Sequence, residues 1–251
     1  MGQLRRRNIQ RVVDMGIKNK TAVVTGGSRG IGKATCKALL EQDYKVIFCG
    51  KEKANVKRAE KELKKYGEVE GHIADLSKVS ETKKFAEAIP NLDVLVNNAG
   101  VAYYKNFQDS SEEEINQTID VNIRALILLT KYLLPKINKN GLIINISSGA
   151  GKHGFGGLAV YCASKFAVLG FTESLAQELK GIKVISICPG GVDTDMYMSM
   201  SSKHPSLKPE HIASKVTDIC LNTEKYKPGS SLDVYKVSDA LNYLRFKYFR
   251  K

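Results

Sequence analysis

Strand-length apolar runs alternate with helix-length segments of mixed polarity along most of this chain. The predicted strands span residues 21–25, 45–49, 69–73, 94–97, 142–147, 183–187 and 231–235. The predicted helices lie near residues 31–42, 52–66, 78–88, 111–136, 159–180 and 209–221. Such alternation, with strands that are apolar on both faces, is typical of a parallel sheet covered by helices on each side. The sequence therefore predicts a single α/β domain built on a doubly wound parallel sheet of about seven strands.

The chain has 251 residues and a formal net charge of +13, but its basic residues gather at the two ends. Residues 1–20 carry a net charge of +5 and residues 241–251 one of +4, which leaves +4 for the long stretch between them. We interpret 1–20 as a basic N-terminal extension, 21–237 as the folded α/β domain and 238–251 as a basic aromatic tail. Basic ends are most often solvated, so we expect no specific nucleic-acid partner and no lasting membrane contact. The arginine-rich head also resembles a short targeting sequence, and Met15 is an alternative natural start.

Five cysteines are scattered along the chain, with no Cys-x-x-Cys pair among them. Their odd number and their spacing favour reduced thiols over a disulfide framework or a zinc site. The four histidines form no metal-binding pattern, so we expect no bound metal. No apolar run reaches the roughly 18–20 residues of a membrane span. These observations together predict a cytoplasmic protein.

A glycine-rich turn, TGGSRGIG at 25–32, lies directly between the first predicted strand and the first predicted helix. Gly26, Gly30 and Gly32 let the backbone turn tightly and approach a pyrophosphate, which the N-terminus of the following helix can bind. A glycine cluster alone is a weak signal, but in this position it indicates a nucleotide site. The sequence therefore predicts the dinucleotide-binding Rossmann form of the α/β fold.

The end of the second predicted strand bears on which nicotinamide cofactor this turn would hold. It reads FCGK at 48–51 and lacks the acidic residue that binds the adenosine ribose of NAD. Lys51 and Arg29 instead offer two cations suited to a 2′-phosphate, unless both are ordinary surface bases. The sequence favours NADP(H) over NAD.

A Tyr-x-x-x-Lys spacing places a phenol and an ammonium on one face of a helix, about one turn apart. The ammonium favours the phenolate, so we expect it to lower the pKa of the tyrosine from about 10 towards neutrality. Three pairs have this spacing: Tyr132 and Lys136, Tyr161 and Lys165, and Tyr243 and Lys247. Ser148 ends an apolar strand thirteen residues before Tyr161, so its hydroxyl could reach the same point. The spacing alone does not choose among the three pairs.

Four motifs occur in the order found in the short-chain dehydrogenase/reductase family, which the chain resembles from about residue 21 to residue 235. They are TGGSRGIG at 25–32, NNAG at 97–100, a Ser-Ser pair at 147–148 before YCASK at 161–165, and PGGVDT at 189–194. The resemblance selects the second tyrosine–lysine pair, because Pro135 interrupts the first and the third lies in the basic tail. The segment PGGVDTDM at 189–196 and the chain length are similar to those of 3-oxoacyl-[acyl-carrier-protein] reductases.

The resemblance implies an NADP(H)-dependent oxidoreductase that interconverts a carbonyl compound and a secondary alcohol, with a 3-oxoacyl thioester as one candidate substrate. Tyr161 would be the general acid/base, and Lys165 would lower its pKa and hold the nicotinamide ribose. Ser148 would hydrogen-bond the substrate oxygen, with Ser147 as an adjacent alternative. Asn122 would order a water that leads to Lys165.

The same resemblance implies a set of cofactor contacts. Asp75 would meet the adenine amino group, and Thr194 would bind the nicotinamide carboxamide unless it serves only as a helix cap. Asn97 or Asn98 could instead tie strands together. The full set is Gly26, Ser28, Arg29, Gly30, Ile31, Gly32, Lys51, Asp75, Leu76, Asn98, Ala99, Gly100, Tyr161, Lys165, Pro189, Gly190, Val192 and Thr194.

Two segments depart from the family pattern. The last predicted strand continues into a basic aromatic tail instead of a Val-Asp-Gly-Gly-type turn. Residues 195–208 are rich in Met, Ser and Lys. Met196, Tyr197, Met198 and Met200 could form an adaptable lid over a substrate, or they could be ordinary packing.

Other functions remain open on the sequence alone. A non-catalytic NADP-binding protein or an NAD-dependent alcohol, sugar or steroid dehydrogenase could share this fold. A serine hydrolase would need a Gly-x-Ser-x-Gly turn, which Ser148 lacks. The resemblance also implies a homodimer or homotetramer, joined through the long helices predicted at 111–136 and 159–180.

Overall fold

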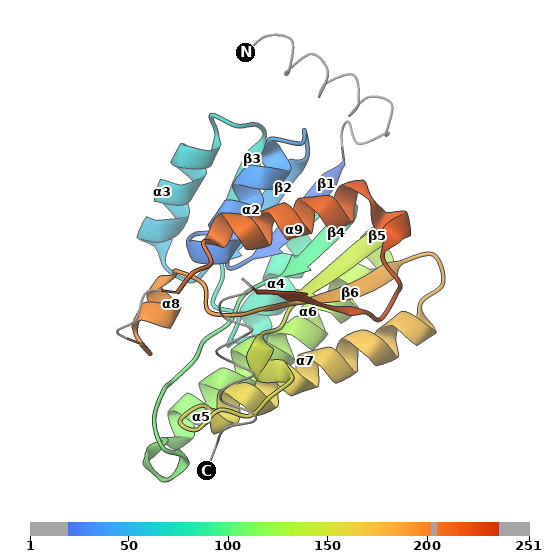
Figure 1. Cartoon of the computed structure of the whole chain (residues 1–251). Coiled ribbons are helices and arrows are strands. Elements are labelled where there is room, and N and C mark those ends of the chain that lie inside the picture. Colours follow the sequence, from blue (N-terminus) through green and yellow to red (C-terminus); the bar gives the residue numbers. More distant parts are fainter. Residues whose placement is uncertain (1–19, 202–204, 236–251) are drawn as a thin grey trace.

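Seven parallel strands form one sheet in the order β3-β2-β1-β4-β5-β6-β7, within the part of the chain that the computed structural model describes, residues 20–201 and 205–235 (Figure 1). Their bounds are β1 Thr21–Thr25, β2 Lys45–Gly50, β3 Val69–Ile73, β4 Leu92–Asn97, β5 Ile137–Ile146, β6 Lys183–Pro189 and β7 Ser231–Val234. The predicted doubly wound sheet is confirmed. The predictions about Met15, the two basic ends, the boundary at 237 and the pair at 243 and 247 lie outside the described residues.

The helices follow the predicted order with two differences. They are α2 Gly30–Leu40, α3 Lys53–Leu63, α4 Val79–Ala88, α5 Glu112–Ile119, α6 Ala125–Leu133, α7 Ala159–Glu178, α8 Asp195–Met198 and α9 Pro209–Leu221. The helix predicted over 111–136 is irregular, because a π-helical turn at Asp120–Arg124 joins α5 to α6 and a 3₁₀ turn at Leu134–Lys136 ends it. The short helix α8 was not predicted.

Two apolar layers hold the helices on the sheet. Helices α2, α3 and α9 cover one face, where Leu39, Leu63 and Val216 pack with Val24 of β1. Helices α4, α6 and α7 cover the other face, where the neighbouring Val23 belongs to the second core cluster (Figure 1). Because successive strand side chains point to opposite faces, a strand that is apolar throughout needs both layers.

A buried polar network crosses the centre of the second layer. The Asn97 amide at the end of β4 donates to Asn145 Oδ1 of β5 at 2.9 Å and to Thr130 Oγ1 of α6 at 3.0 Å. The Asn145 amide in turn donates to Thr172 Oγ1 of α7 at 2.9 Å. Asn97 therefore ties strands and helices together, which was one of the two roles open to Asn97 and Asn98.

The chain reverses its winding direction between β1 and β4. Strand β1 pairs with β2 on one side and with β4 on the other, so the connections from their carboxyl ends leave towards opposite edges of the sheet. Open α/β sheets bind ligands in the crevice at this point. The fold thus predicts a site beyond the carboxyl ends of β1 and β4.

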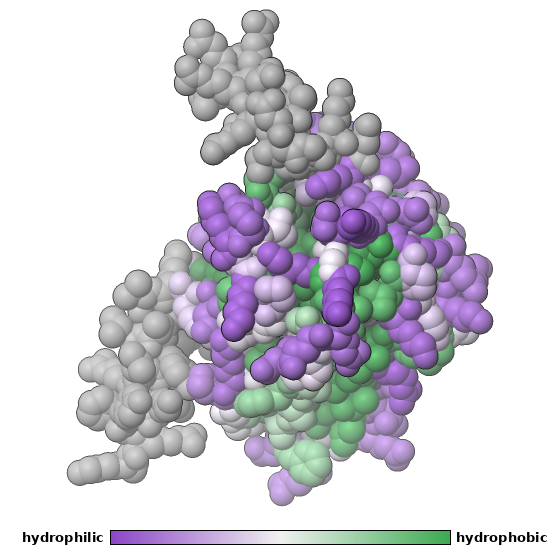
Figure 2. Space-filling view, turned by 90° about the vertical axis from the view of Figure 1, so that its right-hand side faces the viewer, coloured by the Kyte–Doolittle hydropathy of each residue, from purple (hydrophilic) through white to green (hydrophobic). Residues whose placement is uncertain are grey.

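Hydrophilic residues spread over much of the molecular face in Figure 2, with apolar residues showing between them. Within residues 20–201 and 205–235, no helix has the length and apolar character needed to cross a membrane.

Candidate active site

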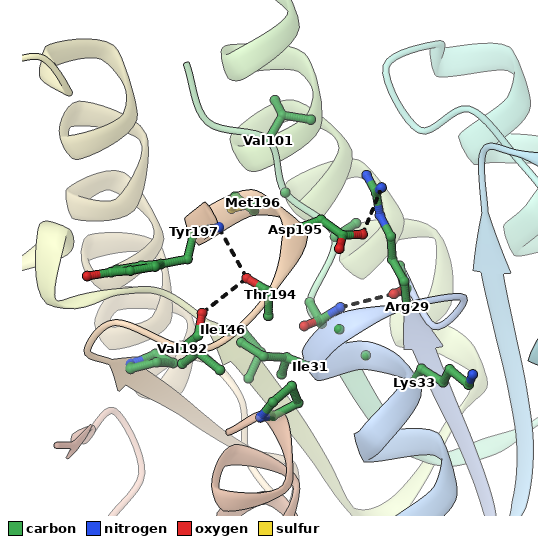
Figure 3. A pocket seen from close by; sticks show the side chains of 18 of the residues that line it. Arg29, Ile31, Lys33, Val101, Ile146, Val192, Thr194, Asp195, Met196 and Tyr197 are labelled. Atoms are coloured by element: carbon green, nitrogen blue, oxygen red, sulfur yellow. Dashed lines mark hydrogen bonds and ion pairs between the residues drawn. The ribbon is translucent and has the colours of Figure 1, made fainter. Parts of the chain in front are cut away.

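A cleft of about 1360 Å³ opens at the carboxyl edge of the sheet (Figure 3). Its walls come from the glycine turn after β1, the segments after β2, β3, β4 and β5, helix α7 and the loop after β6. Every candidate cofactor residue predicted from the sequence lines this cleft, as do Ser148, Tyr161 and Lys165. Asn122 does not line it. One hollow therefore gathers nearly the whole predicted site from segments far apart in the sequence.

The glycine turn forms a close-fitting cradle. Gly26 has a φ of +66°, in the left-handed region that favours glycine. A β-carbon on Gly32 would lie 2.2 Å from the carbonyl oxygen of Gly26, so only glycine fits there. Asn98 Nδ2 donates to the Thr25 carbonyl at 2.8 Å, and this bond fixes the end of β4 beside the turn. These residues fit a pyrophosphate, which needs close approach of the backbone and a helix N-terminus.

The two cations predicted to bind a phosphate each face a carboxylate. Lys51 Nζ lies 3.2 Å from Asp75 Oδ2, and Arg29 Nη1 lies 3.5 Å from Asp195 Oδ2 (Figure 3 shows the second pair). Burial raises the pKa of Asp75, but hydrogen bonds from Ser77 and Lys51 outweigh it and the net shift is downward. Both members of the Arg29 pair are exposed, and Lys51 is the exposed member of its pair, so neither cation is held strongly in place.

Lys165 is buried at the inner end of the cleft. Its side chain reaches from α7 to the end of β5, where Nζ donates to the Ile146 carbonyl at 3.0 Å. The residue is 4% exposed, and burial lowers its pKa to about 8. Nζ also lies 5.7 Å from the centre of the Tyr161 ring. The helical spacing therefore brings the phenol and the ammonium to one place, as predicted.

The predicted effect of Lys165 on its neighbour is not found. Burial raises the pKa of Tyr161, and a hydrogen bond with Ser148 opposes that rise only in part. The expected lowering is wrong for this structure for two reasons. Removing the phenolate from water is costly, and the ammonium is directed to the Ile146 carbonyl.

The two adjacent serines have different surroundings. Ser147 is 3% exposed, and its hydroxyl donates to the Lys165 carbonyl at 2.9 Å. Ser148 Oγ accepts from the Ala150 amide at 3.1 Å and hydrogen-bonds with Tyr161. Of the two, Ser148 is the hydroxyl that meets the phenol, whereas Ser147 holds helix α7 against β5.

Asn122 lies in the π-helical turn between α5 and α6 and is 1% exposed. Its side chain bonds both backbone groups of Val101, with Oδ1 accepting at 2.8 Å and Nδ2 donating at 2.9 Å. Nδ2 also donates to Ser164 Oγ of α7 at 3.0 Å. The residue thus joins the loop after β4 to α7 from outside the cleft, and its predicted role in ordering a water stays a prediction.

Thr194 acts as the N-cap of α8. Its hydroxyl accepts from the Tyr197 amide at 3.3 Å and donates to the Val192 carbonyl at 3.2 Å (Figure 3). This is the capping role that the sequence left open, and contact with a carboxamide stays a prediction. Met196, Tyr197 and Met200 line the cleft as a lid would, whereas Met198 does not line it.

Several cleft residues were not predicted from the sequence. They include Val101, Gln117, Phe155, Leu158 and Tyr235. Val101 follows NNAG directly, so its position was a usable signal. Gln117 lies on helix α5, and the other three lie on irregular segments or directly after a strand, where neither helical nor strand periodicity applies. Among the described residues there is no cluster of three or more possible metal ligands.

Comparison with known proteins agrees with this geometry. The family model for short chain dehydrogenases matches residues 20–205. A 3-oxoacyl-[acyl-carrier-protein] reductase of Chlamydia muridarum is 34% identical over 237 residues, covering 86% of this chain and 96% of that protein.

Two solved structures are also similar. A blue fluorescent protein from a metagenomic library, in complex with NADPH, has a TM-score of 0.81 and 29% identity, covering 87% of this chain and 97% of that one. A 3-ketoacyl-(acyl-carrier-protein) reductase of Brucella melitensis, complexed with NADH, has a TM-score of 0.80 and 27% identity over the same shares. With its sheet order, its glycine cradle and this match over most of its length, the chain belongs to the short chain dehydrogenase family of oxidoreductases.

Proposed function

We propose that this protein is an NADP(H)-dependent oxidoreductase that interconverts a carbonyl compound and a secondary alcohol. One observation carries the proposal. Ser148, Tyr161 and Lys165 meet on the wall of the same cleft whose other end is the glycine cradle. A proton donor and a nucleotide cradle in one cleft suit hydride transfer at a carbonyl carbon.

The roles of the side chains follow from their surroundings. The nicotinamide supplies or accepts the hydride when it is bound. The Tyr161 phenol gives its proton to the carbonyl oxygen during reduction, because its raised pKa keeps it protonated near neutrality. Ser148 directs its hydroxyl at the same oxygen as negative charge develops there. Lys165, with a pKa of about 8, can return a proton to the phenol at physiological pH.

We further propose that the protein prefers NADP(H) to NAD(H). Structures of similar proteins contain NADPH in one case and NADH in another, so the glycine cradle alone does not determine which of the two cofactors is preferred. Lys51 and Arg29 both line the cleft, and both side chains are exposed. Two cations near one 2′-phosphate would favour the phosphorylated cofactor.

Replacing both Lys51 and Arg29 with alanine is expected to raise the KM for NADPH about tenfold or more, since charged hydrogen bonds to the phosphate are lost. The KM for NADH should change by less than about threefold. Lys53→Ala is the matched control, because Lys53 is exposed at the start of α3 but does not line the cleft. Equal changes in both KM values would contradict the cofactor preference.

The reaction class is tested by following NADPH absorbance with a panel of ketones, quinones, sugars and short 3-oxoacyl thioesters. Oxidation of NADPH with at least one carbonyl compound is the expected result. A 3-oxoacyl thioester is the first compound to try, given the similar reductase of Chlamydia muridarum. Tight NADPH binding with unchanged absorbance across the panel would favour a non-catalytic binding protein instead.

A homodimer or homotetramer is also part of the proposal. Ile127 on α6 is 37% exposed and Phe166 on α7 is 47% exposed, and both are large apolar side chains. Burial of these residues between copies would remove apolar surface from water. Light scattering after size-exclusion chromatography should give a mass of two or four chains, and a monomer would contradict the proposal.

A further inference from the structure

Two tyrosine rings pack against the two consecutive glycines that follow β6, Gly190 and Gly191. A β-carbon on Gly190 would lie 2.8 Å from Cδ1 of Tyr235. A β-carbon on Gly191 would lie 2.7 Å from Cε2 of Tyr197. Any other residue at either position would push a ring out of place, because atoms this close must move apart. The absence of a side chain at the two glycines thus allows both rings to occupy these positions.

Tyr235 reaches this place through the sheet. Pro189 of β6 is in register with Val234 of β7, and the Gly190 amide donates to the Val234 carbonyl at 3.0 Å. The next residue, Tyr235, therefore lies directly beside Gly190. Its ring extends towards the residue after Ser148, since a β-carbon on Gly149 would lie 3.2 Å from the Tyr235 hydroxyl oxygen. Tyr235 lines the cleft and is 38% exposed.

Tyr197 reaches the second of these glycines, Gly191, from α8. Its amide is held by Thr194 Oγ1 at 3.3 Å, in the first turn of the helix. Figure 3 shows the Tyr197 side chain beside Thr194 and Val192 at the cleft. Tyr235 therefore directly follows β7, and Tyr197 lies on α8; the backbone beside each ring is held by one hydrogen bond, from Gly190 to Val234 and from Tyr197 to the Thr194 hydroxyl.

The cleft is also lined by apolar side chains. Phe155 is 42% exposed, and it lines the cleft together with Leu158, Met196 and Met200. The carboxylate of Asp233, which also faces the cleft, is paired with Lys152 at 2.6 Å. A neighbouring acid with its own cation offers little to a charged substrate group, whereas the rings and methionines suit an apolar one.

We propose that Tyr235 and Tyr197 determine substrate specificity by binding a planar aromatic group attached to the carbonyl carbon. The inference rests on the proposed carbonyl chemistry and names its substrate class. Aromatic rings stabilise another ring by offset or edge-to-face contact beyond simple burial of area. An alkyl ring of equal size gains the burial but lacks the aromatic contact. A preference for aromatic over alicyclic ketones is therefore the property that these tyrosines confer.

The test compares acetophenone with cyclohexyl methyl ketone in wild-type protein and in variants. The measured quantity is the ratio of kcat/KM for the two ketones, because their intrinsic reactivities divide out when one variant is compared with another. Tyr235→Leu and Tyr197→Leu should each lower the ratio by about three- to tenfold, in line with the strength of aromatic pairs. Tyr235→Phe and Tyr197→Phe keep the ring and should keep the ratio within about twofold.

Tyr104→Leu is the matched control. Tyr104 also rests on a glycine, since a β-carbon on Gly157 would lie 2.8 Å from its Cε2, but it does not line the cleft. The ratio should stay unchanged in this variant. An unchanged ratio in both leucine variants of the cleft tyrosines, or an equal fall in Tyr104→Leu, would overturn the proposal. Thermal unfolding and NADPH affinity show whether each variant is folded.

Binding of the product alcohols keeps the inference separate from the proposed function. The dissociation constants of 1-phenylethanol and 1-cyclohexylethanol are measured by calorimetry in the same variants. If no carbonyl compound is reduced, the proposed reaction fails, and the ratio of these constants still tests the aromatic preference. If turnover is normal but neither ratio responds to Tyr235→Leu or Tyr197→Leu, the inference alone fails.

Discussion

Replacing Tyr161 with phenylalanine is expected to lower kcat by about 10²–10⁴-fold, the usual contribution of a general acid/base. The ring and its packing on α7 remain, so only the proton donor at the Ser148–Lys165 end of the cleft is lost. The dissociation constant for NADPH, measured by fluorescence titration, should change by less than about threefold. This variant should therefore lose activity but keep its affinity for NADPH.

Tyr132→Phe is the matched control for this experiment. Tyr132 and Lys136 have the same spacing as the active pair, but Tyr132 packs against the core cluster beneath α4 and α6. Its replacement should leave kcat unchanged. A Tyr161→Phe variant with normal turnover would rule out the proposed acid/base, whatever substrate is used.

Replacing Lys165 with methionine is expected to have opposite effects on activity and stability. The kcat should fall by on the order of 10²-fold or more, because the phenol loses its neighbouring proton source. The free energy of unfolding should rise by about 1–2 kcal/mol at pH 7. The lowered pKa of about 8, against an ordinary 10.5, corresponds to a cost of about 3 kcal/mol, part of which the bond to Ile146 offsets.

The size of this stability effect depends on pH. Below about pH 8, Lys165 is charged in both folded and unfolded states, so its full cost is present. Between about pH 8 and 10.5 only the unfolded state keeps the proton, and the wild-type protein gains stability as pH rises. The advantage of Lys165→Met should therefore shrink over this range in thermal unfolding of the cofactor-free protein. An advantage that grows with pH would contradict the assignment.

Lys136→Met provides the contrast. Lys136 Nζ donates to the carbonyls of Ala86, Glu87 and Ile89 at the end of α4, at 2.8, 3.2 and 2.6 Å. Cations stabilise the C-terminus of a helix, so this variant should lose about 1 kcal/mol of stability and keep its activity. Of the two lysines with the same spacing from a tyrosine, Lys165 thus lowers the free energy of unfolding and Lys136 raises it.

Much of the fold was predictable because it depends on periodic apolar patterns and on glycines at positions that no other residue can occupy without strain. The strands of residues 21–25 and 69–73 were predicted to the residue, since each is bounded by turn-forming segments. The cleft was predictable for a related reason. Motif residues follow directly after strand ends, and parallel strands bring those ends together.

What the sequence could not predict depends on three-dimensional surroundings. The π-helical turn at Asp120–Arg124 arises where Asn122 bonds Val101 and Ser164, which lie far from it in the sequence. The raised pKa of Tyr161 reflects burial, which residue spacing does not encode. Tyr235 occupies the cleft because of the β6–β7 register, and no local pattern marks it.

The paired asparagines in the middle of the sheet have a consequence for the reacting groups. Asn97 and Asn145 are direct partners in the β4–β5 register. A slip of one residue would turn one of them to the opposite face and leave buried amides unpaired, at a cost of about 1–3 kcal/mol for each group. Asn98 of the cradle follows the first asparagine immediately, and Ser148 follows the second by three residues. The paired amides therefore fix the register between β4 and β5. This register sets the position of Ser148 relative to the nucleotide site in the protein without ligand.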